Sequence, residues 1–230
     1  MSISYDVLVE GNSLSFKGGF FGFSSIILIK SAAHGLLLFD TGHHSTRLLL
    51  INALQERGLS PTDINYVFLS HLHFDHVNNI DLFTQATIYL SAEEWKYAQN
   101  PNNSDPFCSP AINLYLQQQK LIFLENSTGE IFPNLFYRHT PGHTPGSYVL
   151  HFVNQQNKRV VLAGDACKTY KELASLEVVS EFDPEKRAQQ SLIWMNNYAD
   201  VVIPGHFPPL FRTENGWLWH ENTHLELIVR

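Results

Sequence analysis

Short apolar runs alternate with amphipathic segments along the first half of the chain. An apolar run bounded by turn residues predicts a buried strand, and apolar positions that recur every three or four residues predict a helix. On this basis we expect strands at residues 4–11, 24–30, 35–40, 65–69 and 87–91. We expect helices at residues 45–58 and 92–99, and Gly58 is placed to end the first of them.

The second half of the chain repeats this alternation of apolar runs and turns. We expect strands at residues 120–125, 135–140, 147–153, 158–164 and 200–204. Residues 154–157 are the turn of a hairpin that joins two of these strands. Asn215 and Gly216 form a second turn, which belongs to a terminal hairpin.

Two further helices are expected in the second half, at residues 111–119 and 183–199. Asp183 is placed to cap the second of these helices, and Pro184 stands at its first position. Strands and helices therefore alternate in two comparable halves. This arrangement predicts two sheets with helices outside them, in a single domain over residues 1–230.

Two segments have a role that the pattern leaves open. Phe20, Phe21 and Phe23 lie among glycines between two expected strands, so they form either a mobile aromatic flap that binds substrate or part of the core. A flap would favour an apolar acyl or aromatic substrate over a polyanion. Residues 100–110 contain three prolines and form either a lid or a surface insertion.

A dense polar cluster follows the expected strand at residues 65–69. His71, His73, Asp75 and His76 fall within six residues. A solvated polar loop would also accept these residues. However, three imidazoles and a carboxylate are costly to bury together unless a cation holds them. Neutral imidazole combined with carboxylate suits zinc best, so the cluster predicts a zinc site.

Three more residues of the metal-binding type occur far away in the sequence. His143, Asp165 and His206 each follow an apolar run and a tight turn. Ligands at strand ends converge along one edge of a sheet, where the rigid strands hold them in place. The pattern therefore predicts a site that binds more than one metal ion.

Composition excludes several other classes of protein. The chain has 230 residues, of which 44% are hydrophobic and 16% charged, as in an ordinary globular protein. Its formal net charge of -7 gives no positive field to attract nucleic acid. No apolar run has transmembrane length, and the first residues lack the pattern of a secretory signal. Cys108 and Cys167 do not suggest a disulfide framework, so we expect a cytoplasmic protein without a membrane partner.

The polar motifs resemble those of a known family. LLLFDTG, HLHFDH, PGHTPGS, GDA and PGHF look like the successive motifs of the metallo-beta-lactamase fold superfamily, and the similarity runs from about residue 5 to 215. The resemblance implies an α+β fold, a four-layer αββα sandwich with the site between the sheet edges. It also implies that Asp40 fixes the metal-binding loops by hydrogen bonding rather than by binding metal.

The same resemblance implies two metal positions, each with three ligands of its own and one shared ligand. It implies two zinc ions per chain, with iron or manganese as alternatives. The ligands are, for the first position, His71, His73 and His143, for the second position, Asp75, His76 and His206, and for the bridge between them, Asp165.

Such a site would support hydrolysis. Two metals a few ångström apart can share a hydroxide whose lowered pKa makes it a nucleophile near neutral pH. One metal would polarise the carbonyl or phosphoryl oxygen, and the other would stabilise the leaving group. Asp75, beside the bridging oxygen, would act catalytically by orienting the nucleophile and passing its proton to the leaving group.

At several positions this sequence departs from individual branches of the family, and these departures reduce the range of possible substrates. The commonest antibiotic-hydrolysing lactamases carry a cysteine at the position of Asp165, and the diiron flavoproteins carry a glutamate at that of His71. Acyl-homoserine lactonases place a tyrosine three residues after the bridging aspartate, where this chain has Lys168. Lys168 and Tyr170 either supply an oxyanion donor or simply begin a helix at residues 169–175.

The leading hypothesis is a dinuclear zinc-dependent hydrolase of a small carboxylic ester, thioester or lactone. One alternative is a metal-dependent phosphodiesterase or nuclease of the same fold. Others are a mononuclear-iron persulfide dioxygenase with an empty second position and a metal-binding member without turnover. We expect a small molecule as the partner; the acidic charge disfavours nucleic acid without excluding it, and a homodimer is left open.

Overall fold

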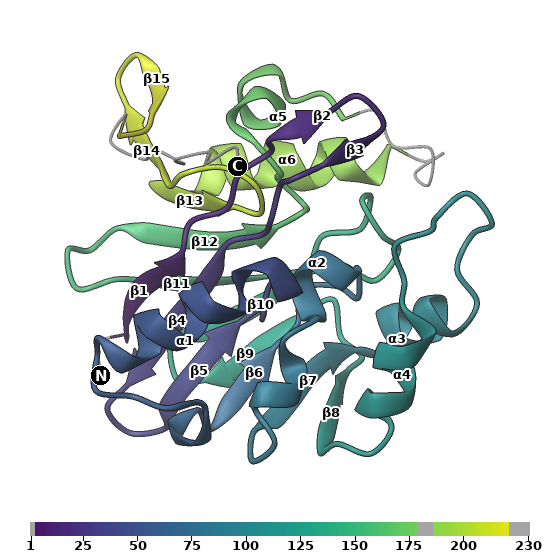
Figure 1. The fold of residues 1–230 in the computed structure, drawn as a ribbon. Coiled ribbons are helices and arrows are strands. Elements are labelled where there is room, and N and C mark those ends of the chain that lie inside the picture. The colour runs from purple at the N-terminus through teal and green to yellow at the C-terminus, as the bar shows by residue number, and fades with distance from the viewer. Residues whose placement is uncertain (1–2, 179–185, 221–230) are drawn as a thin grey trace, which may run out of the picture.

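The protein consists of two facing β-sheets with helices on both outer sides (Figure 1). The computed structural model describes residues 3–178 and 186–220. The six-stranded sheet has the order β1 (Ile3–Val9), β4 (Ile26–Ser31), β5 (Gly35–Phe39), β6 (Tyr66–Phe68), β7 (Thr87–Ser91), β8 (Leu121–Leu124). The seven-stranded sheet has the order β15 (Gly216–Leu218), β14 (Leu210–Thr213), β13 (Val201–Pro204), β12 (Arg159–Gly164), β11 (Tyr148–Val153), β10 (Leu135–His139), β9 (Thr128–Phe132). A separate short hairpin consists of β2 (Ser15–Phe16) and β3 (Gly19–Phe20).

The helices of the described residues are short. The α-helices are α1 (Arg47–Gln55), α2 (Phe74–Val77), α3 (Ala92–Gln99), α4 (Pro110–Leu116), α5 (Tyr170–Ser175) and α6 (Arg187–Tyr198). Three 3-10 turns accompany them, η1 (His44–Thr46), η2 (Pro61–Asp63) and η3 (Ile80–Leu82). Within the described ranges, none of these helices has both the length and the apolar character needed to cross a bilayer.

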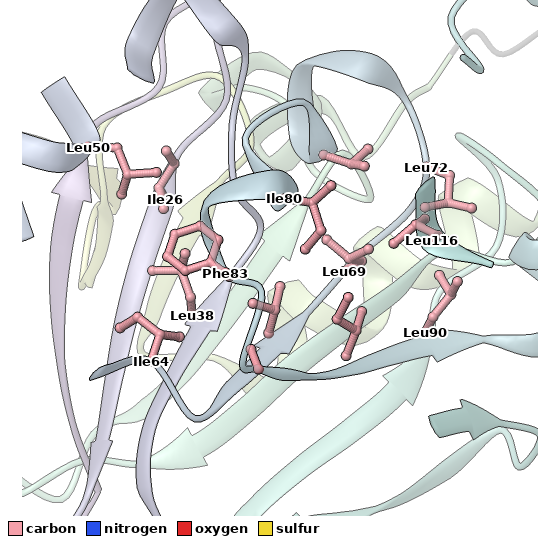
Figure 2. Packing of buried hydrophobic residues seen from close by; sticks show 14 of the residues in the cluster. Ile26, Leu38, Leu50, Ile64, Leu69, Leu72, Ile80, Phe83, Leu90 and Leu116 are labelled. Atoms are coloured by element: carbon pink, nitrogen blue, oxygen red, sulfur yellow. The ribbon is translucent and has the colours of Figure 1, made fainter. Parts of the chain in front are cut away.

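Strand β4 begins with four consecutive apolar residues, because both of its faces are buried there. Alternate residues of a strand face opposite sides of a sheet, and both sides of β4 are buried. Ile27 and Ile29 pack between the two sheets. Ile26 and Leu28 belong to the outer cluster, which α1 closes with Leu50 (Figure 2). Full burial of each such side chain contributes about 1.5–3 kcal/mol to stability.

The seven-stranded sheet is likewise covered on both faces. On its outer face Val161 of β12 and Val202 of β13 pack with Leu192 and Met195 of α6. The layers therefore run helices, sheet, sheet, helices (Figure 1). This confirms the predicted αββα sandwich of α+β class.

Most of the expected elements form, and there is a physical reason why one strand was not expected. Strand β9 (Thr128–Phe132) was not expected, because only its last two residues are apolar and it pairs with a single neighbour at the edge of its sheet. The helix expected at 183–199 is described as α6 from Arg187 onward. Asp183 and Pro184, expected to cap it, lie outside the described residues.

Candidate metal centre

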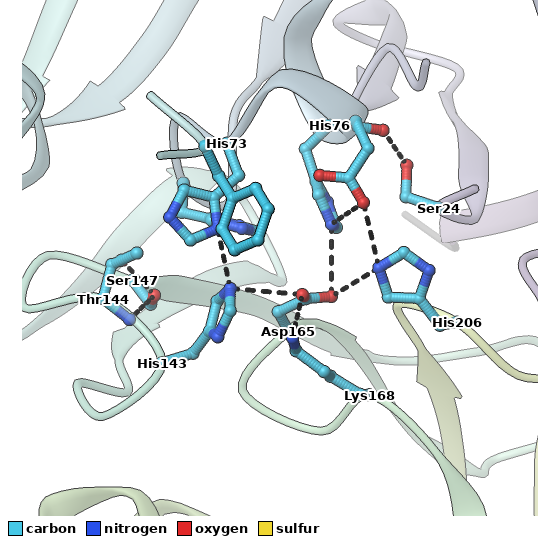
Figure 3. A network of polar contacts seen from close by, with 12 residues as sticks. Ser24, His73, His76, His143, Thr144, Ser147, Asp165, Lys168 and His206 are labelled. Carbon is cyan, nitrogen blue, oxygen red and sulfur yellow. Dashed lines mark hydrogen bonds and ion pairs between the residues drawn. The ribbon is translucent and has the colours of Figure 1, made fainter. Parts of the chain in front are cut away.

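The expected ligands gather where strands of the two sheets end. Strand β6 leads into a loop with His71 and His73 and then into α2, which carries Asp75 and His76, at one side of the site. From the other sheet, β12 leads directly to Asp165, and its parallel neighbour β13 leads to His206. His143 lies in the loop between β10 and β11. Figure 3 shows His73, His76, His143 and His206 around Asp165.

The backbone is shaped to let these groups approach one another. Gly205 precedes His206, and a Cβ atom at this position would lie 2.2 Å from Asp165 Oδ1. Only glycine leaves room for that carboxylate. Asp40 has a positive φ of 55°, which is strained for a non-glycine residue and is typical of functional sites.

The first position consists of three imidazoles. The ligating atoms of His71, His73 and His143 all lie within 4.8 Å of one another. His143 Nε2 is 2.9 Å from His73 Nδ1. These nitrogens come from loops of the two different sheets, so only the assembled sandwich creates this group.

The second position combines a carboxylate with two imidazoles. His206 Nε2 lies 3.2 Å from Asp75 Oδ2, and His76 Nε2 lies 3.8 Å from the same oxygen. Their ligating atoms also lie within 4.8 Å of one another.

Asp165 lies between the two positions. Its Oδ2 is 3.2 Å from His143 Nε2 of the first position. Its Oδ1 is 3.1 Å from His76 Nε2 and 3.3 Å from His206 Nε2 of the second position. The carboxylate therefore directs one oxygen toward each position, as a bridging ligand requires (Figure 3).

Buried polar atoms without partners test whether these residues suit metal ions. His71 Nε2, His76 Nε2 and Asp165 Oδ1 are buried and make no hydrogen bond within the described structure, although the last two lie 3.1 Å apart. An unsatisfied buried polar atom costs about 1–3 kcal/mol, so such a group needs another partner. Two donor atoms that each lie about 2.1 Å from a tetrahedral zinc ion are about 3.4 Å apart, close to the separations found here. The residues fit metal ions at both positions.

The outer nitrogens of the histidines fix which ring atom faces the site. His76 Nδ1 lies 2.8 Å from Asp40 Oδ2, and a carboxylate can only accept, so Nδ1–H donates and Nε2 is the nitrogen that faces the site. His206 Nδ1 likewise donates to the carbonyl of Phe23 at 3.2 Å. Asp40 also accepts hydrogen bonds from the backbone N–H and the hydroxyl of Ser70, both at 2.7 Å. Asp40 thus makes the loop contacts expected of it.

The carboxylates and imidazoles of the site shift one another's pKa. Burial alone would lower the pKa of His206, but Asp165 and Asp75 raise it to about 9. Burial and then the neighbouring imidazoles lower the pKa of His71 well below its usual value. Burial would raise the pKa of Asp75, yet His76 and His206 hold it below its usual range. The carboxylates are therefore ionised and draw positive charge toward them.

A cavity of about 230 Å³ opens onto this centre. Aromatic rings form much of its wall, and Phe20 stacks on Phe74 with ring centroids 5.9 Å apart. Phe107, from the loop expected at residues 100–110, forms another part of the wall. Lys168 also lines the cavity, with its Nζ 3.3 Å from Asp165 Oδ2. Burial would lower the pKa of Lys168, but Asp165 raises it, so the ammonium stays charged.

The other expected substrate contacts do not line this cavity. Phe21 is 59% exposed and packs on Phe16 of the β2–β3 hairpin, with ring centroids 4.7 Å apart. Phe23 packs against the outer core cluster. Tyr170 begins α5 and packs on Trp219 at 4.8 Å. Of the three phenylalanines expected to form a flap, the structure places Phe20 alone at the cavity, because its neighbours are held by the hairpin and the core.

Two buried carboxylates beside the first position were not anticipated from the sequence. Glu94 of α3 accepts hydrogen bonds from the backbone N–H of Leu72 at 2.9 Å and from the hydroxyl of Thr144 at 2.7 Å. Asp105 lies 3.0 Å from His73 through its Oδ2. The only local pattern at Glu94 is a helix N-terminus capped by Ser91, and Asp105 stands in a loop of polar residues. Neither context points to a metal site.

Residues 19–206 match the family model of the metallo-beta-lactamase superfamily. The chain is 32% identical over 225 residues to metallo-beta-lactamase domain-containing protein 1 of Xenopus laevis, covering 96% of this chain and 86% of that protein. The chain belongs to the metallo-beta-lactamase superfamily. It is accordingly a metal-dependent hydrolase with a candidate His/Asp metal site.

Two further similarities place this superfamily member among proteins of related architecture. An N-acyl homoserine lactonase of Bacillus thuringiensis is 31% identical over 137 residues, which cover 59% of this chain and 52% of the lactonase. A probable metal-dependent hydrolase from Staphylococcus aureus has the same fold, with a TM-score of 0.76 and 20% identity over 97% of this chain and 98% of that one.

Proposed function

We propose that this superfamily member binds two zinc ions and hydrolyses a small carboxylic ester, thioester or lactone. The observation that carries the proposal is the bridging placement of Asp165, which directs one oxygen toward each group of histidines. The unsatisfied nitrogens of His71 and His76 support two occupied positions, because each position has one of them.

The residues around the centre would divide the work of hydrolysis. Zinc at both positions would lower the pKa of the attacking water and polarise the scissile carbonyl. Asp75 lines the cavity as a carboxylate and would orient that water. The Lys168 ammonium would donate a hydrogen bond to the oxygen that gains charge in the transition state. This lysine takes the role that the sequence pattern of lactonases gives to a tyrosine.

The residues of the cavity wall favour a substrate with an apolar acyl group over a polyanionic substrate. Leu14, Phe20, Phe74 and Phe107 surround the approach to the centre. Among the described residues that line the cavity, Lys168 is the single lysine or arginine. A nucleic-acid chain carries a charged phosphate at every nucleotide, and the described residues of this wall offer no second lysine or arginine for the phosphates away from the centre. The similarity to an N-acyl homoserine lactonase supports the same substrate class.

The thiols support a reducing compartment. Cys108 and Cys167 are both free, and Cys167 is buried. Free thiols persist where the environment is reducing, so we propose a cytoplasmic location.

Metal analysis combined with a substrate panel tests this proposal. Purified protein should contain two zinc ions per chain and should hydrolyse at least one of a nitrophenyl ester, an acyl thioester and an acyl lactone. Activity on bis-nitrophenyl phosphate alone would overturn the substrate class. One iron per chain together with consumption of dioxygen would overturn hydrolysis itself.

A further inference from the structure

One histidine of the first position is backed by a carboxylate that lies outside all of the metal motifs. Asp105 belongs to the loop between α3 and α4, and it is 5% exposed. Its Oδ2 lies 3.0 Å from His73 Nε2, while His73 Nδ1 faces His143 Nε2 at 2.9 Å. The ring of His73 therefore connects Asp105 on one side to the metal position on the other.

Asp105 is itself held in place from two directions. The hydroxyl of Tyr97, on α3, donates a hydrogen bond to Oδ2 at 2.7 Å. The backbone N–H of Phe107 donates to Oδ1 at 3.0 Å. With these bonds and the one from His73, both oxygens of the carboxylate are engaged. A carboxylate fixed this firmly can determine the orientation of the imidazole it contacts.

The contact between Asp105 and His73 determines which ring nitrogen of His73 carries the proton. The carboxylate of Asp105 can only accept, so His73 carries its proton on Nε2 and presents the lone pair of Nδ1 to the first position. A carboxylate partner also makes the ligating nitrogen more basic and stops the ring from turning. Asp40 has the same relation to His76 at the second position, at 2.8 Å. Each position thus has one histidine with a carboxylate behind it.

We propose that Asp105 is a positioning residue that orients His73 for the first metal position and couples the loop at 101–109 to that position. The inference rests on the proposed metal centre. The coupling follows because Asp105 also holds the N–H of Phe107, whose ring lines the cavity. Phe107 in turn accepts a hydrogen bond from the N–H of Phe74 at 2.9 Å. One carboxylate therefore anchors both the metal position and a wall of the substrate cavity.

Zinc titration of the metal-free protein against a chelating indicator tests the positioning role. The wild type should bind in two steps. Asp105→Asn should weaken one step about ten- to a hundredfold and leave the other unchanged, since loss of such a partner costs about that factor in metal affinity. Tyr97→Phe should weaken the same step by a smaller factor. Asp81→Asn is the matched control, because its partner is Arg47 on the surface and its loss should change neither step.

Two measurements separate positioning from a merely structural role. The metal-free Asp105→Asn protein should melt below the wild type, because its amide NH₂ would face a donor that now binds an oxygen, and zinc should raise its melting temperature less than it raises that of the wild type. If the variant weakened both steps equally, or neither, the positioning role would be overturned. Should Asp105→Asn fail to fold, an unchanged titration of Tyr97→Phe would count against the assignment in the same way.

Hydrogen exchange tests the coupling to the loop. Zinc should slow exchange in peptides that contain Phe107 in the wild type, and should slow it less in Asp105→Asn. Equal exchange with and without zinc in the wild type would overturn the coupling.

These results are independent of the proposed reaction. If the protein bound two zinc ions but cleaved no ester, thioester or lactone, the proposed function would be overturned. The role of Asp105 would be unaffected. If the wild type bound zinc in a single step and Asp105→Asn weakened that step, only the proposal of two zinc ions would be overturned. A single step that it leaves unchanged would overturn the role of Asp105.

Discussion

Single side chains at this centre direct their ligand atoms toward common points. The nitrogens of His71 and His76 that face the site are buried and have no hydrogen-bond partner among the described residues, and the same is true of one oxygen of Asp165. Lys168 is the one lysine or arginine among the described cavity residues, and it already contacts Asp165 at 3.3 Å. Its ammonium is therefore held at the cavity wall beside a candidate metal ligand.

Replacing Lys168 tests its role at the scale of one residue. Lys168→Met should lower kcat about 10²–10³-fold with little change in KM, because the lost hydrogen bond acts mainly in the transition state. Steady-state kinetics on the substrate identified by the panel would measure this. Lys168→Arg, which keeps the charge, should retain part of the activity. Zinc content should be determined for both variants, and full activity in Lys168→Met with two zinc ions would show that the lysine is not catalytic.

At the scale of elements, helix α3 braces the loops that carry the first position. Its side chain Glu94 is fully buried and joins the loop of His73 to the loop of His143, through Leu72 and Thr144 respectively. Burial raises the pKa of Glu94, although these hydrogen bonds oppose the shift. A buried carboxylate that binds donors of two loops fixes their relative positions.

Glu94→Gln should therefore lower the free energy of unfolding. Its amide NH₂ would face donors that now bind an oxygen, and one such mismatch costs about 1–3 kcal/mol. Chemical denaturation of the metal-free protein would measure the change. Glu93→Gln is the matched control, since Glu93 is the preceding residue and its side chain is 51% exposed. If both variants had the same stability, Glu94 would not brace the loops.

At the scale of the whole molecule, the two sheets share one inner core, and the outer face of each sheet is covered by helices. His151 of β11 lies in the outer interface, where its Nδ1 is 3.1 Å from the hydroxyl of Tyr198 on α6. Burial, followed by the positive charge of Arg138, lowers the pKa of His151 to about 4. This interface therefore excludes a protonated imidazole.

This histidine should make stability depend on pH. Between pH 6.5 and about 4 the unfolded chain binds a proton at this residue and the folded protein does not. Stability is therefore lost as the pH falls through this window. His151→Phe should show a smaller loss between pH 6.5 and 4 in equilibrium unfolding experiments. An identical loss in both proteins would mean that other groups cause the acid sensitivity.

Several parts of the fold follow from the sequence because their signals are local. The run at residues 24–30 is apolar on every position that faces a core, and it forms β4 between two buried faces. The segment at 92–99 begins after a capping serine and coincides with α3. Strand β9 could not be found in this way, since its polar residues gain their pairing only from β10 in the assembled sheet.

The sequence by itself determined which side chains are able to bind metal, because imidazole and carboxylate groups after apolar runs form a recognisable pattern. Only the tertiary structure decided which carboxylates hold these candidate ligands in position by hydrogen bonding. Asp105 meets His73 across 32 residues of sequence, and Glu94 meets Thr144 across 50. A carboxylate in a polar loop or at a helix start has an ordinary local explanation. Its partners are set by the packing of distant segments, which no local pattern records.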